Sequence, residues 1–389
     1  MHVALVVPGG VDRSGRTRVI PALLWLIEAL SAEHRVTVVA LGQEAAAGRW
    51  RLAGAEVLNV PAEARGPHRL ARMVTRGVRA VGAPGRPDVV HGFWASVSGL
   101  VAVAAARRLR RPSVVHVAGG ELVAFPELGY GGALGRGGRL IAAAALRGAD
   151  RVTAPSEWMA DHVRARGHRV HAVIPLGVDL RRFSRGHVPP APHHAVQVAD
   201  LNPVKDQRTL LQAAAIVRAA LPAFTLDVFG VDTLGGRLQR QAEELDLGGC
   251  VRFCGFVPSD QLAPHLRRAA VHVISSRHDA GPIAVLEAAA CGAPTVGTRV
   301  GHGADLASLA EPAAVAVAPG DPEALAAALL DVLRDPPRRA RLADAAAAWA
   351  EAHDARAGAA ALTRLYAELS VKRSSSAAAS SGSPPRAST

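Results

Sequence analysis

Short apolar runs alternate with longer stretches of alanine, leucine and arginine along most of this chain. In the first half, the apolar runs are rich in β-branched residues and lie at residues 2–7, 35–41, 88–93, 113–119, 151–156 and 171–177. Strands that are apolar on both faces, each followed by a stretch of helical length, indicate a parallel sheet that helices cover on both sides. The first half therefore predicts an α/β fold with a doubly wound, Rossmann-like sheet.

The same alternation resumes after a proline- and histidine-rich stretch. That stretch, "RGHVPPAPH" at residues 185–193, has the composition of a stiff, extended linker. The later apolar runs lie at residues 194–200, 224–230, 251–256, 270–276, 294–300 and 314–319. We therefore expect two Rossmann-like doubly wound domains, residues 1–184 and 194–350, which face each other across a cleft.

The end of the chain departs from this rhythm. A helical pattern continues to about residue 370, and we expect residues 351–371 to form a helix that returns to the first domain. Residues 372–389 contain no large apolar side chain, which predicts a disordered tail. No apolar run approaches the roughly 20 residues that a membrane span needs, so we expect a cytoplasmic protein.

The charge favours anionic partners, because 45 basic residues outnumber 33 acidic ones and the formal net charge is +12. Nearly all the basic residues are arginine, and Lys205 and Lys372 are the only lysines. The basic run at 107–111 could touch an anionic membrane surface or could be a solvated helix end. Three cysteines exclude a disulfide framework and indicate a reducing compartment. No histidine or cysteine spacing predicts a metal site, and no cofactor is expected.

In open α/β sheets ligands bind beyond the carboxyl ends of the strands, so the informative residues should follow the apolar runs. One such stretch is "HDAGPIAVLEAAACG" at residues 278–292. Gly281 and Pro282 open a helix there, as their positions favour. The amides of Gly281, Ile283 and Ala284 should then be free donors at a helix N-terminus, where an anion is favoured.

Two carboxylates flank this helix start. Asp279 lies in the turn and Glu287 lies near one helical turn beyond Ile283, so both can face one site. The alternative is that Asp279 caps the helix while Glu287 is solvated. Glu287 is the only charged residue between Pro282 and Arg299, which predicts partial burial and hence a polar partner such as a sugar hydroxyl.

Two further segments carry cations near strand ends. Lys205, in "LNPVKD", stands where an ammonium can reach phosphate oxygens, although a solvated turn lysine remains the alternative. The loop 7–18 is glycine-rich at Gly9 and Gly10, and it carries Arg13 and Arg16. It lacks the G-x-G-x-x-G spacing of a dinucleotide fingerprint, but its backbone could approach a phosphate.

Polar residues also follow two strands of the first domain. His91 in "DVVHGFW" and His116 in "VVHVAGGE" occupy equivalent strand ends, and Glu121 follows the second one. A strand-end histidine is often structural. Two at neighbouring strands predict polar groups on one cleft wall, and we expect His91 and Glu121 on the acceptor side.

These motifs together resemble the retaining glycosyltransferases of family 4, which have the two-domain GT-B fold. The resemblance covers nearly the whole folded chain through "APSEWM", "IPLGVD", "LNPVKD", "VRFCGFVP" and "SSRHDAGPIAVLEAAACGAPTVGT". It implies a nucleotide-sugar donor held mostly by the second domain, an acceptor held by the first, retention of anomeric configuration and no metal requirement.

The resemblance also implies roles for individual residues. Asp279 and Glu287 match the two acids of the family's Glu-x7-Glu motif, and Glu287 would bind the donor ribose. Lys205 matches the lysine on the diphosphate, and His116 matches a histidine near the transferred sugar. Phe256, in "FCGFVP", would border the base.

Two residues depart from the family pattern. Asp279 is one methylene shorter than the usual glutamate, and Asp200 replaces an arginine that commonly precedes the lysine by five positions. Arg13 or Arg16 could replace that lost positive charge from across the cleft. A shift of about 1 Å at a reacting centre can cost roughly a hundredfold in rate.

Two other functions remain open at this point. A nucleotide-sugar-binding protein of the same fold could have lost catalysis, with Asp200 and Asp279 as the marks of that loss. A nucleic-acid-binding protein is suggested by charge alone, but no recognisable motif supports it and aromatic residues make up only 4% of the chain. The donor sugar, its base and the acceptor, whether a glycan, a lipid-linked group or a small molecule, are not indicated by the sequence.

Overall fold

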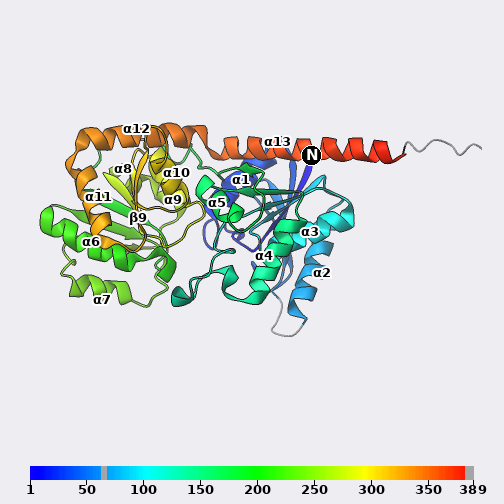
Figure 1. The fold of residues 1–389 in the computed structure, drawn as a ribbon, viewed down its shortest axis with the longest axis horizontal. Coiled ribbons are helices and arrows are strands. Elements are labelled where there is room, and N and C mark those ends of the chain that lie inside the picture. The colour runs from blue at the N-terminus through cyan, green and yellow to red at the C-terminus, as the bar shows by residue number, and fades with distance from the viewer. Residues whose placement is uncertain (63–67, 382–389) are drawn as a thin grey trace, which may run out of the picture.

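The structure, a computed structural model, describes residues 1–62 and 68–381, with side chains to residue 371. Two α/β lobes lie side by side, and helices near the C-terminus run along one side of both (Figure 1). No cis peptide bond occurs in the described part of the chain. The mixed α/β fold with two predominantly parallel sheets confirms the fold class expected from the alternating apolar runs.

The N-terminal sheet has eight strands in the order β3-β4-β2-β1-β5-β6-β7-β8. All neighbours pair in parallel except β3 and β4, which form an antiparallel edge hairpin. The strands are β1 (His2–Val7), β2 (Arg35–Leu41), β3 (Gly48–Leu52), β4 (Ala55–Val60), β5 (Val89–Phe93), β6 (Ser113–His116), β7 (Arg151–Ala154) and β8 (Ala172–Val173).

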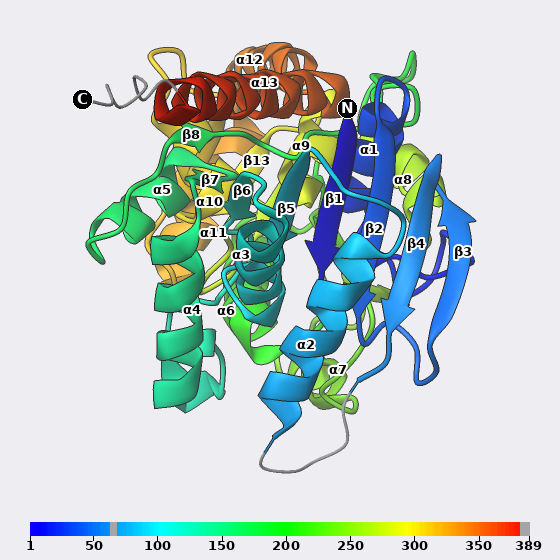
Figure 2. The same ribbon diagram turned by 90° about the vertical axis from the view of Figure 1, so that its right-hand side faces the viewer.

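Helices cover both faces of this sheet (Figure 2). One face carries α1 (Pro21–Ser31) together with the C-terminal helix, and the other carries α2, α3 and α4 in a row. These three are α2 (Arg69–Gly82), α3 (Val97–Leu109) and α4 (Arg136–Gly148); the remaining elements are α5 (Glu157–Arg164), η1 (Pro126–Leu128) and η2 (Gly132–Leu134).

The C-terminal sheet has six parallel strands in the order β11-β10-β9-β12-β13-β14. They are β9 (His194–Val198), β10 (Thr225–Phe229), β11 (Val251–Gly255), β12 (Val271–Ile274), β13 (Thr295–Thr298) and β14 (Ala314–Val317). Its helices are α6 (Gln207–Ala220), α7 (Arg237–Glu244), α8 (Ala263–Arg268), α9 (Ile283–Ala290), α10 (Gly301–Ala307), α11 (Pro322–Arg334) and α12 (Pro336–Ala352), with η3 (Pro203–Lys205) and η4 (Ser259–Gln261) as short turns.

The strand order reverses once in each sheet. In the C-terminal sheet the reversal lies between β9 and β12, and in the N-terminal sheet it lies between β1 and β5. At such a point the connections leave in opposite directions and open a crevice beyond the carboxyl ends of the two strands, where ligands bind. The topology therefore assigns two candidate crevices, one to each domain.

The C-terminal helix α13 (Ala355–Ser381) packs on the N-terminal domain, as Figure 1 shows. Its Leu362 and Tyr366 are buried in the core that α1 also lines. The helix continues to Ser381, so the expectation of a disordered tail from residue 372 is wrong for residues 372–381. Residues 372–381 are mostly serine and alanine and contain no glycine or proline, so no helix-breaking residue precedes Gly382. Residues 382–389 lie outside the described part of the chain.

Candidate active site

A cavity of about 740 Å³ lies between the two domains, and its lining comes from both. The N-terminal domain contributes Gly15, Arg16, Arg18, Trp25, Leu52 and Arg182, and the C-terminal domain contributes Asp200, Lys205, Phe256, Asp260, Ile283 and Glu287, among others. The C-terminal side of this cleft cavity follows β9 and β12, which is the reversal point of that sheet. Its position agrees with the crevice that the topology assigns.

Lys205 is placed by the short turn η3, in the loop after β9. The Asn202 side chain accepts a hydrogen bond from the Lys205 amide at 3.1 Å, and Asp206 then caps α6 by accepting from the Thr209 amide. These caps fix the backbone on both sides of the lysine. The Lys205 ammonium forms an ion pair with the Asp279 carboxylate.

The loops after β9 and β12 are bonded to each other. The Ser275 hydroxyl donates to the Lys205 carbonyl at 2.7 Å and accepts from the Gln197 side-chain amide at 3.0 Å. The Arg277 amide donates to the Val204 carbonyl at 2.8 Å. Because these bonds hold one loop against the other, Lys205 and Asp279 meet although 74 positions separate them in the chain.

Helix α9 begins at the cleft with Pro282 as its N-cap residue. Ile283 and Ala284 line the cavity, and their amides donate to no acceptor among the described residues. Gly281 and Pro282 do not line it. Gly281 instead lies against the other domain, where a Cβ would approach Pro155 to 2.8 Å, so this close contact requires glycine.

Glu287 lies one turn further along α9, and its carboxylate lines the cavity while the residue is only 2% exposed. No hydrogen bond or ion pair joins the Glu287 carboxylate to another described residue, although the Glu287 carbonyl accepts from the Cys291 amide. Burial raises the pKa of the Glu287 carboxyl to about 8. A buried acid without a protein partner, at the wall of a cavity, is poised to bind polar groups of a ligand.

The far end of the cavity is bordered by the segment after β11. Phe256 lines it and is 51% exposed, an unusual position for a large aromatic side chain. The Asp260 carboxylate forms an ion pair at 2.6 Å with Arg16 of the N-terminal domain. Asp200 also lines the cavity, and its side chain accepts a hydrogen bond from the Val231 amide at 2.9 Å.

The glycine-rich loop differs from the expectation. Gly15 and Arg16 reach the cleft cavity, whereas Gly9, Gly10 and Arg13 do not line it. Gly9 and Gly10 have φ of +150° and +80°, and a Cβ on Gly10 would clash with Ile20, so these glycines serve the turn itself. Of the two arginines considered as replacements for the cation lost at Asp200, Arg16 is thus the one at the cleft.

Arg13 points away from the cleft because it has partners within its own domain. Its guanidinium pairs with Glu44 at 2.9 Å and lies over the Trp50 ring at 4.9 Å.

The two strand histidines do not form a cleft wall, which corrects the prediction for His91 and His116. Both side chains lie inside the N-terminal domain, 0% and 1% exposed. His91 Nδ1 lies 2.7 Å from the Tyr366 hydroxyl of α13, and His116 Nδ1 lies 2.9 Å from the Thr153 hydroxyl. Both side chains point to the face of the sheet that α13 covers, because strand residues alternate between faces. Burial lowers the pKa of His116 to about 3, so the imidazole is neutral.

Glu121 is also buried, and it joins the loops after β5 and β6. Its Oε1 accepts hydrogen bonds from the amides of Ala95 and Ala118, each at 3.0 Å. Its Oε2 has no partner among the described residues, and burial raises the pKa of this carboxyl. The residue therefore organises the carboxyl edge of the N-terminal sheet.

His278 forms a contact between the two domains that the sequence did not predict. It directly precedes Asp279, is 2% exposed, and its Nε2 donates to the Gly119 carbonyl of the other domain at 3.3 Å. The Trp158 ring lies 5.3 Å from it. The stretch around Asp279 was recognised, but nothing local in the sequence indicates that its histidine contacts the first domain.

Within the described residues, no group of three or more His, Cys, Asp or Glu side chains could hold a metal ion. Over the same residues, no helix is both long and apolar enough to cross a membrane.

Two α/β domains with a cavity between them, at a reversal point, match the GT-B fold, and solved structures agree. Sucrose-phosphate synthase from Thermosynechococcus elongatus superposes with a TM-score of 0.80 over 95% of this chain and 99% of its own, at 20% identity. Anabaena Alr3699/HepE, solved with UDP and glucose, superposes with a TM-score of 0.73 over 95% of this chain and all of its own, at 19% identity. At such identities these likenesses establish the fold.

Sequence comparison establishes the family. A model of the glycosyl transferases group 1 family matches residues 184–349, and a model of the glycosyl transferase 4-like domain matches residues 19–177. D-inositol 3-phosphate glycosyltransferase from Frankia alni is 33% identical over 292 residues, which are 67% of this chain and 69% of that protein. Glycogen synthase from Mycobacterium tuberculosis is 30% identical over 268 residues, 67% of this chain and 64% of that protein. The chain belongs to the group 1 glycosyl transferases, which confirms the resemblance.

Other curated relatives are matched over a smaller share. For the D-inositol 3-phosphate glycosyltransferase of Corynebacterium jeikeium, the chain spans about half the relative's length, 51%, at 32% identity.

Proposed function

We propose that this protein transfers a glycosyl group from a nucleoside diphosphate sugar, bound in the cleft cavity, to an acceptor hydroxyl with retention of anomeric configuration. The observation that carries the proposal is that Lys205 and Glu287 line one cavity at one reversal point, while Asp279, which does not line it, forms an ion pair with Lys205. The family membership gives the reaction class, and these residues give each part of the donor a partner.

The diphosphate would lie between Lys205 and the start of α9. The free amides of Ile283 and Ala284 and the ammonium all favour an anion there. When the bond from the anomeric carbon to the phosphate oxygen breaks, negative charge develops on the diphosphate. A cation and backbone amides already fixed in place stabilise that charge without reorganisation, which is the main electrostatic contribution to rate.

The remaining parts of the donor find partners on either side. Glu287 would accept hydrogen bonds from the ribose hydroxyls, and Phe256 would lie along the base. Asp279, paired with Lys205, would bind hydroxyls of the transferred sugar. The acceptor oxygen forms the new bond to the anomeric carbon on the face that the diphosphate leaves, and the acceptor proton passes to the departing phosphate.

We propose that this chemistry requires no divalent metal, because Lys205 supplies a cation and the amides of α9 supply hydrogen-bond donors. Solved structures of the Anabaena protein contain UDP and UDP-glucose, so uridine nucleotides are the first donors to test. The family relatives named for D-inositol 3-phosphate suggest an acceptor with a phosphate group as the first acceptor to test.

We also propose that the protein works in the cytoplasm and contacts an anionic membrane surface peripherally. Helices α2, α3 and α4 form one layer of the N-terminal domain and together carry nine arginines and no acidic residue. Such a layer is attracted to acidic lipids. Sedimentation with phosphatidylglycerol vesicles, but not with pure phosphatidylcholine vesicles, is the expected result; equal sedimentation with both, or with neither, would contradict it.

The proposal is tested by incubating the protein with UDP-, GDP-, ADP- and dTDP-sugars in the presence of EDTA. Slow release of one nucleoside diphosphate, followed by phosphorus NMR, is expected, with a sugar product that first appears in the donor's own anomeric configuration. Binding of a donor without any release or transfer would instead indicate a nucleotide-sugar-binding protein that has lost catalysis, with Lys205 neutralised by Asp279. Absence of both binding and release would remove the proposed function.

A further inference from the structure

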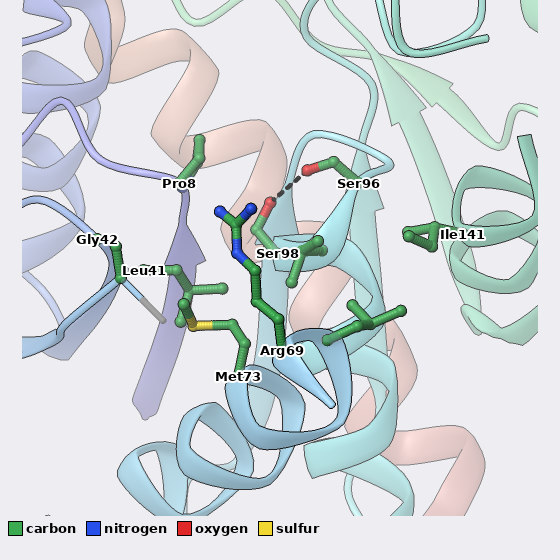
Figure 3. A pocket seen from close by; sticks show the side chains of 11 residues that line it. Pro8, Leu41, Gly42, Arg69, Met73, Ser96, Ser98 and Ile141 are labelled. Carbon is green, nitrogen blue, oxygen red and sulfur yellow. Dashed lines mark hydrogen bonds between the residues drawn. The ribbon is translucent and has the colours of Figure 1, made fainter. Parts of the chain in front are cut away.

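A second cavity, of about 470 Å³, lies in the N-terminal domain (Figure 3). Pro8 follows β1, Leu41 ends β2, and Ser96 precedes α3 after β5. The cavity therefore lies at the reversal point of the N-terminal sheet, between β1 and β5, as the cleft cavity does in the other sheet. The N-terminal ends of α2 and α3 also face it, through Arg69 and Val97.

The walls of this cavity are mostly apolar. Leu41, Leu70, Met73, Val97 and Ile141 supply them, from the end of β2 and from three different helices. Met73 is buried, and Leu70 is 40% exposed at the edge. Figure 3 shows Leu41 and Met73 on one side and Ile141 on the other, with Arg69 and Ser98 between them. A cavity of this kind takes an apolar group of a ligand.

One cation, of the exposed residue Arg69, lies at the edge of these apolar walls. The Arg69 side chain extends from α2 toward Pro8 and Ser98 in Figure 3. No hydrogen bond or ion pair joins its guanidinium to a described residue, whereas Arg13 and Arg18 of the same domain pair with carboxylates. The cavity lining contains no Asp or Glu. The guanidinium thus lacks a counter-ion on the wall that it faces.

The local backbone also favours an anion. Arg69 is in the first turn of α2, where the helix dipole opposes a cation, and that turn contains no acid. The amides of Val97 and Ser98, in the first turn of the 13-residue α3, donate to no acceptor in the described part of the chain, unlike those of Gly99 and Leu100. An anionic group beside Arg69 would satisfy the guanidinium and face these amides.

We infer that this Arg69 pocket binds the acceptor, and that the acceptor joins an apolar body to an anionic group of the phosphate or carboxylate kind. The apolar body would lie among Leu41, Met73 and Ile141, and the anion would lie against Arg69. The assignment as acceptor rests on the proposed function. The chemical class rests on the pocket alone.

The loop after β1 connects this pocket with the donor side. Pro8 lines the Arg69 pocket, and Gly15 and Arg16 of the same loop line the cleft cavity. An acceptor in the Arg69 pocket is thus bordered by the segment that also borders the donor.

The test measures binding of n-octyl phosphate by calorimetry, with no donor present. Wild-type protein should bind it at least about tenfold more tightly than it binds neutral octyl glucoside or inorganic phosphate, because only octyl phosphate supplies both parts. Hexyl phosphate should bind more weakly by about fourfold for each methylene removed. Equal affinity for inorganic phosphate and octyl phosphate would overturn the proposed class.

Two variants with matched controls locate the site. Arg69→Ala should weaken the binding of octyl phosphate about tenfold. Arg79→Ala, on the same helix but outside the pocket, should leave this affinity unchanged. Ile141→Asp should abolish binding, while Leu140→Asp, at the adjacent position that is 71% exposed, should not. If Arg69→Ala and Ile141→Asp bind like wild type, the pocket is not the site.

Two further measurements identify the source of the anion and separate this inference from the proposed function. Phosphatidic acid vesicles that sediment wild type more strongly than Arg69→Ala, with no such difference for phosphatidylglycerol vesicles, would indicate a bilayer lipid as the source of the anion. Octyl phosphate binding without that difference would indicate a soluble amphiphile. Nucleoside diphosphate binding is measured on the same preparations. If wild type binds a nucleoside diphosphate but not octyl phosphate, the result counts against this pocket alone, whereas a wild type that binds no nucleotide counts against the proposed function.

Discussion

Lys205 and Asp279 form an ion pair at the reversal point of the C-terminal sheet, where the loops after β9 and β12 meet. Both side chains are mostly buried, with 25% and 16% of their surface exposed. In the ligand-free protein each charge thus neutralises the other. A donor diphosphate would provide Lys205 with a second anion, and the sugar would provide Asp279 with hydroxyl donors, so the pair can remain intact while both bind.

Replacing Lys205 by alanine should lower the rate of glycosyl transfer by about 10² to 10³, because one fixed charge on the departing diphosphate is lost. Lys205→Arg should not restore it fully, since the guanidinium is larger and planar. The measurement is kcat for the donor identified in the hydrolysis screen. Arg208→Ala removes an exposed cation from the first turn of α6, outside the cavity, and serves as control. Equal losses in both variants would show that Lys205 has no special role.

The raised pKa of Glu287 predicts a pH-dependent affinity for the donor. The carboxyl has a pKa of about 8, so it is largely protonated at neutral pH and gains acceptor strength as pH rises. If ribose hydroxyls donate to the carboxylate, affinity should increase between about pH 6 and pH 8, at most about tenfold per pH unit. Glu287→Gln should bind weakly and without this dependence. Titration calorimetry at several pH values checks it, and a pH-independent wild type would contradict it.

The same residue predicts an opposite effect on stability. The folded-state pKa of Glu287, about 8, lies above its ordinary value of 4.5, so the folded protein binds more protons between these pH values. The free energy of unfolding therefore falls as pH rises through this window. Glu287→Gln avoids that loss and should be more stable than wild type at pH 8, by at most about 4 kcal/mol, and little different at pH 4.5. Denaturant unfolding at both pH values measures this.

The buried contact between His91 and Tyr366 should matter for stability and not for donor binding. Tyr366→Phe leaves His91 Nδ1 without its partner at 2.7 Å inside the core and should cost about 1–3 kcal/mol of unfolding free energy. Tyr130→Phe changes the only other tyrosine, which is partly exposed, and should cost little. A Tyr366→Phe protein with unchanged stability would contradict the structural role given to His91.

The Arg16–Asp260 ion pair joins the two domains at the edge of the cleft cavity. Its side chains are 60% and 40% exposed, so it should contribute at most about 1 kcal/mol to stability. Arg16→Glu places like charges on opposite sides of the cleft and should increase the radius of gyration measured by small-angle X-ray scattering. The exchanged pair, Arg16→Asp with Asp260→Arg, should reverse the change. Arg13→Glu, whose partner Glu44 lies in the same domain, should have no such effect.

Most of the fold could be predicted because its strands are local apolar runs. The hairpin of β3 and β4 was not predicted, since Gly48–Leu52 alternates exposed and half-buried residues at the sheet edge and contains no continuous apolar run. The turn that joins the strands, Ala53–Gly54, has positive φ at both residues, a two-residue hairpin turn whose alanine gives little signal in sequence.

The candidate site could be predicted where it depends on single loops, and only there. Lys205, Ile283, Ala284 and Glu287 line the cleft because each lies in the loop after a strand or in the first two turns of the helix that follows it. Contacts between domains depend on how the two lobes meet, which no local pattern encodes. The hydrogen bond from His278 to Gly119 belongs to this class.

The most direct test of the account is the thermal stabilisation of the protein by nucleoside diphosphates, for wild type, Glu287→Ala and the exposed control Glu244→Ala. A ligand present at 100 times its dissociation constant adds about 2.7 kcal/mol of stability. We predict that one of UDP, GDP, ADP and dTDP raises the Tm of wild type and of Glu244→Ala, and that Glu287→Ala loses this shift. A wild type that responds to none of them, or a Glu287→Ala protein that responds like wild type, would contradict a donor site in the cleft.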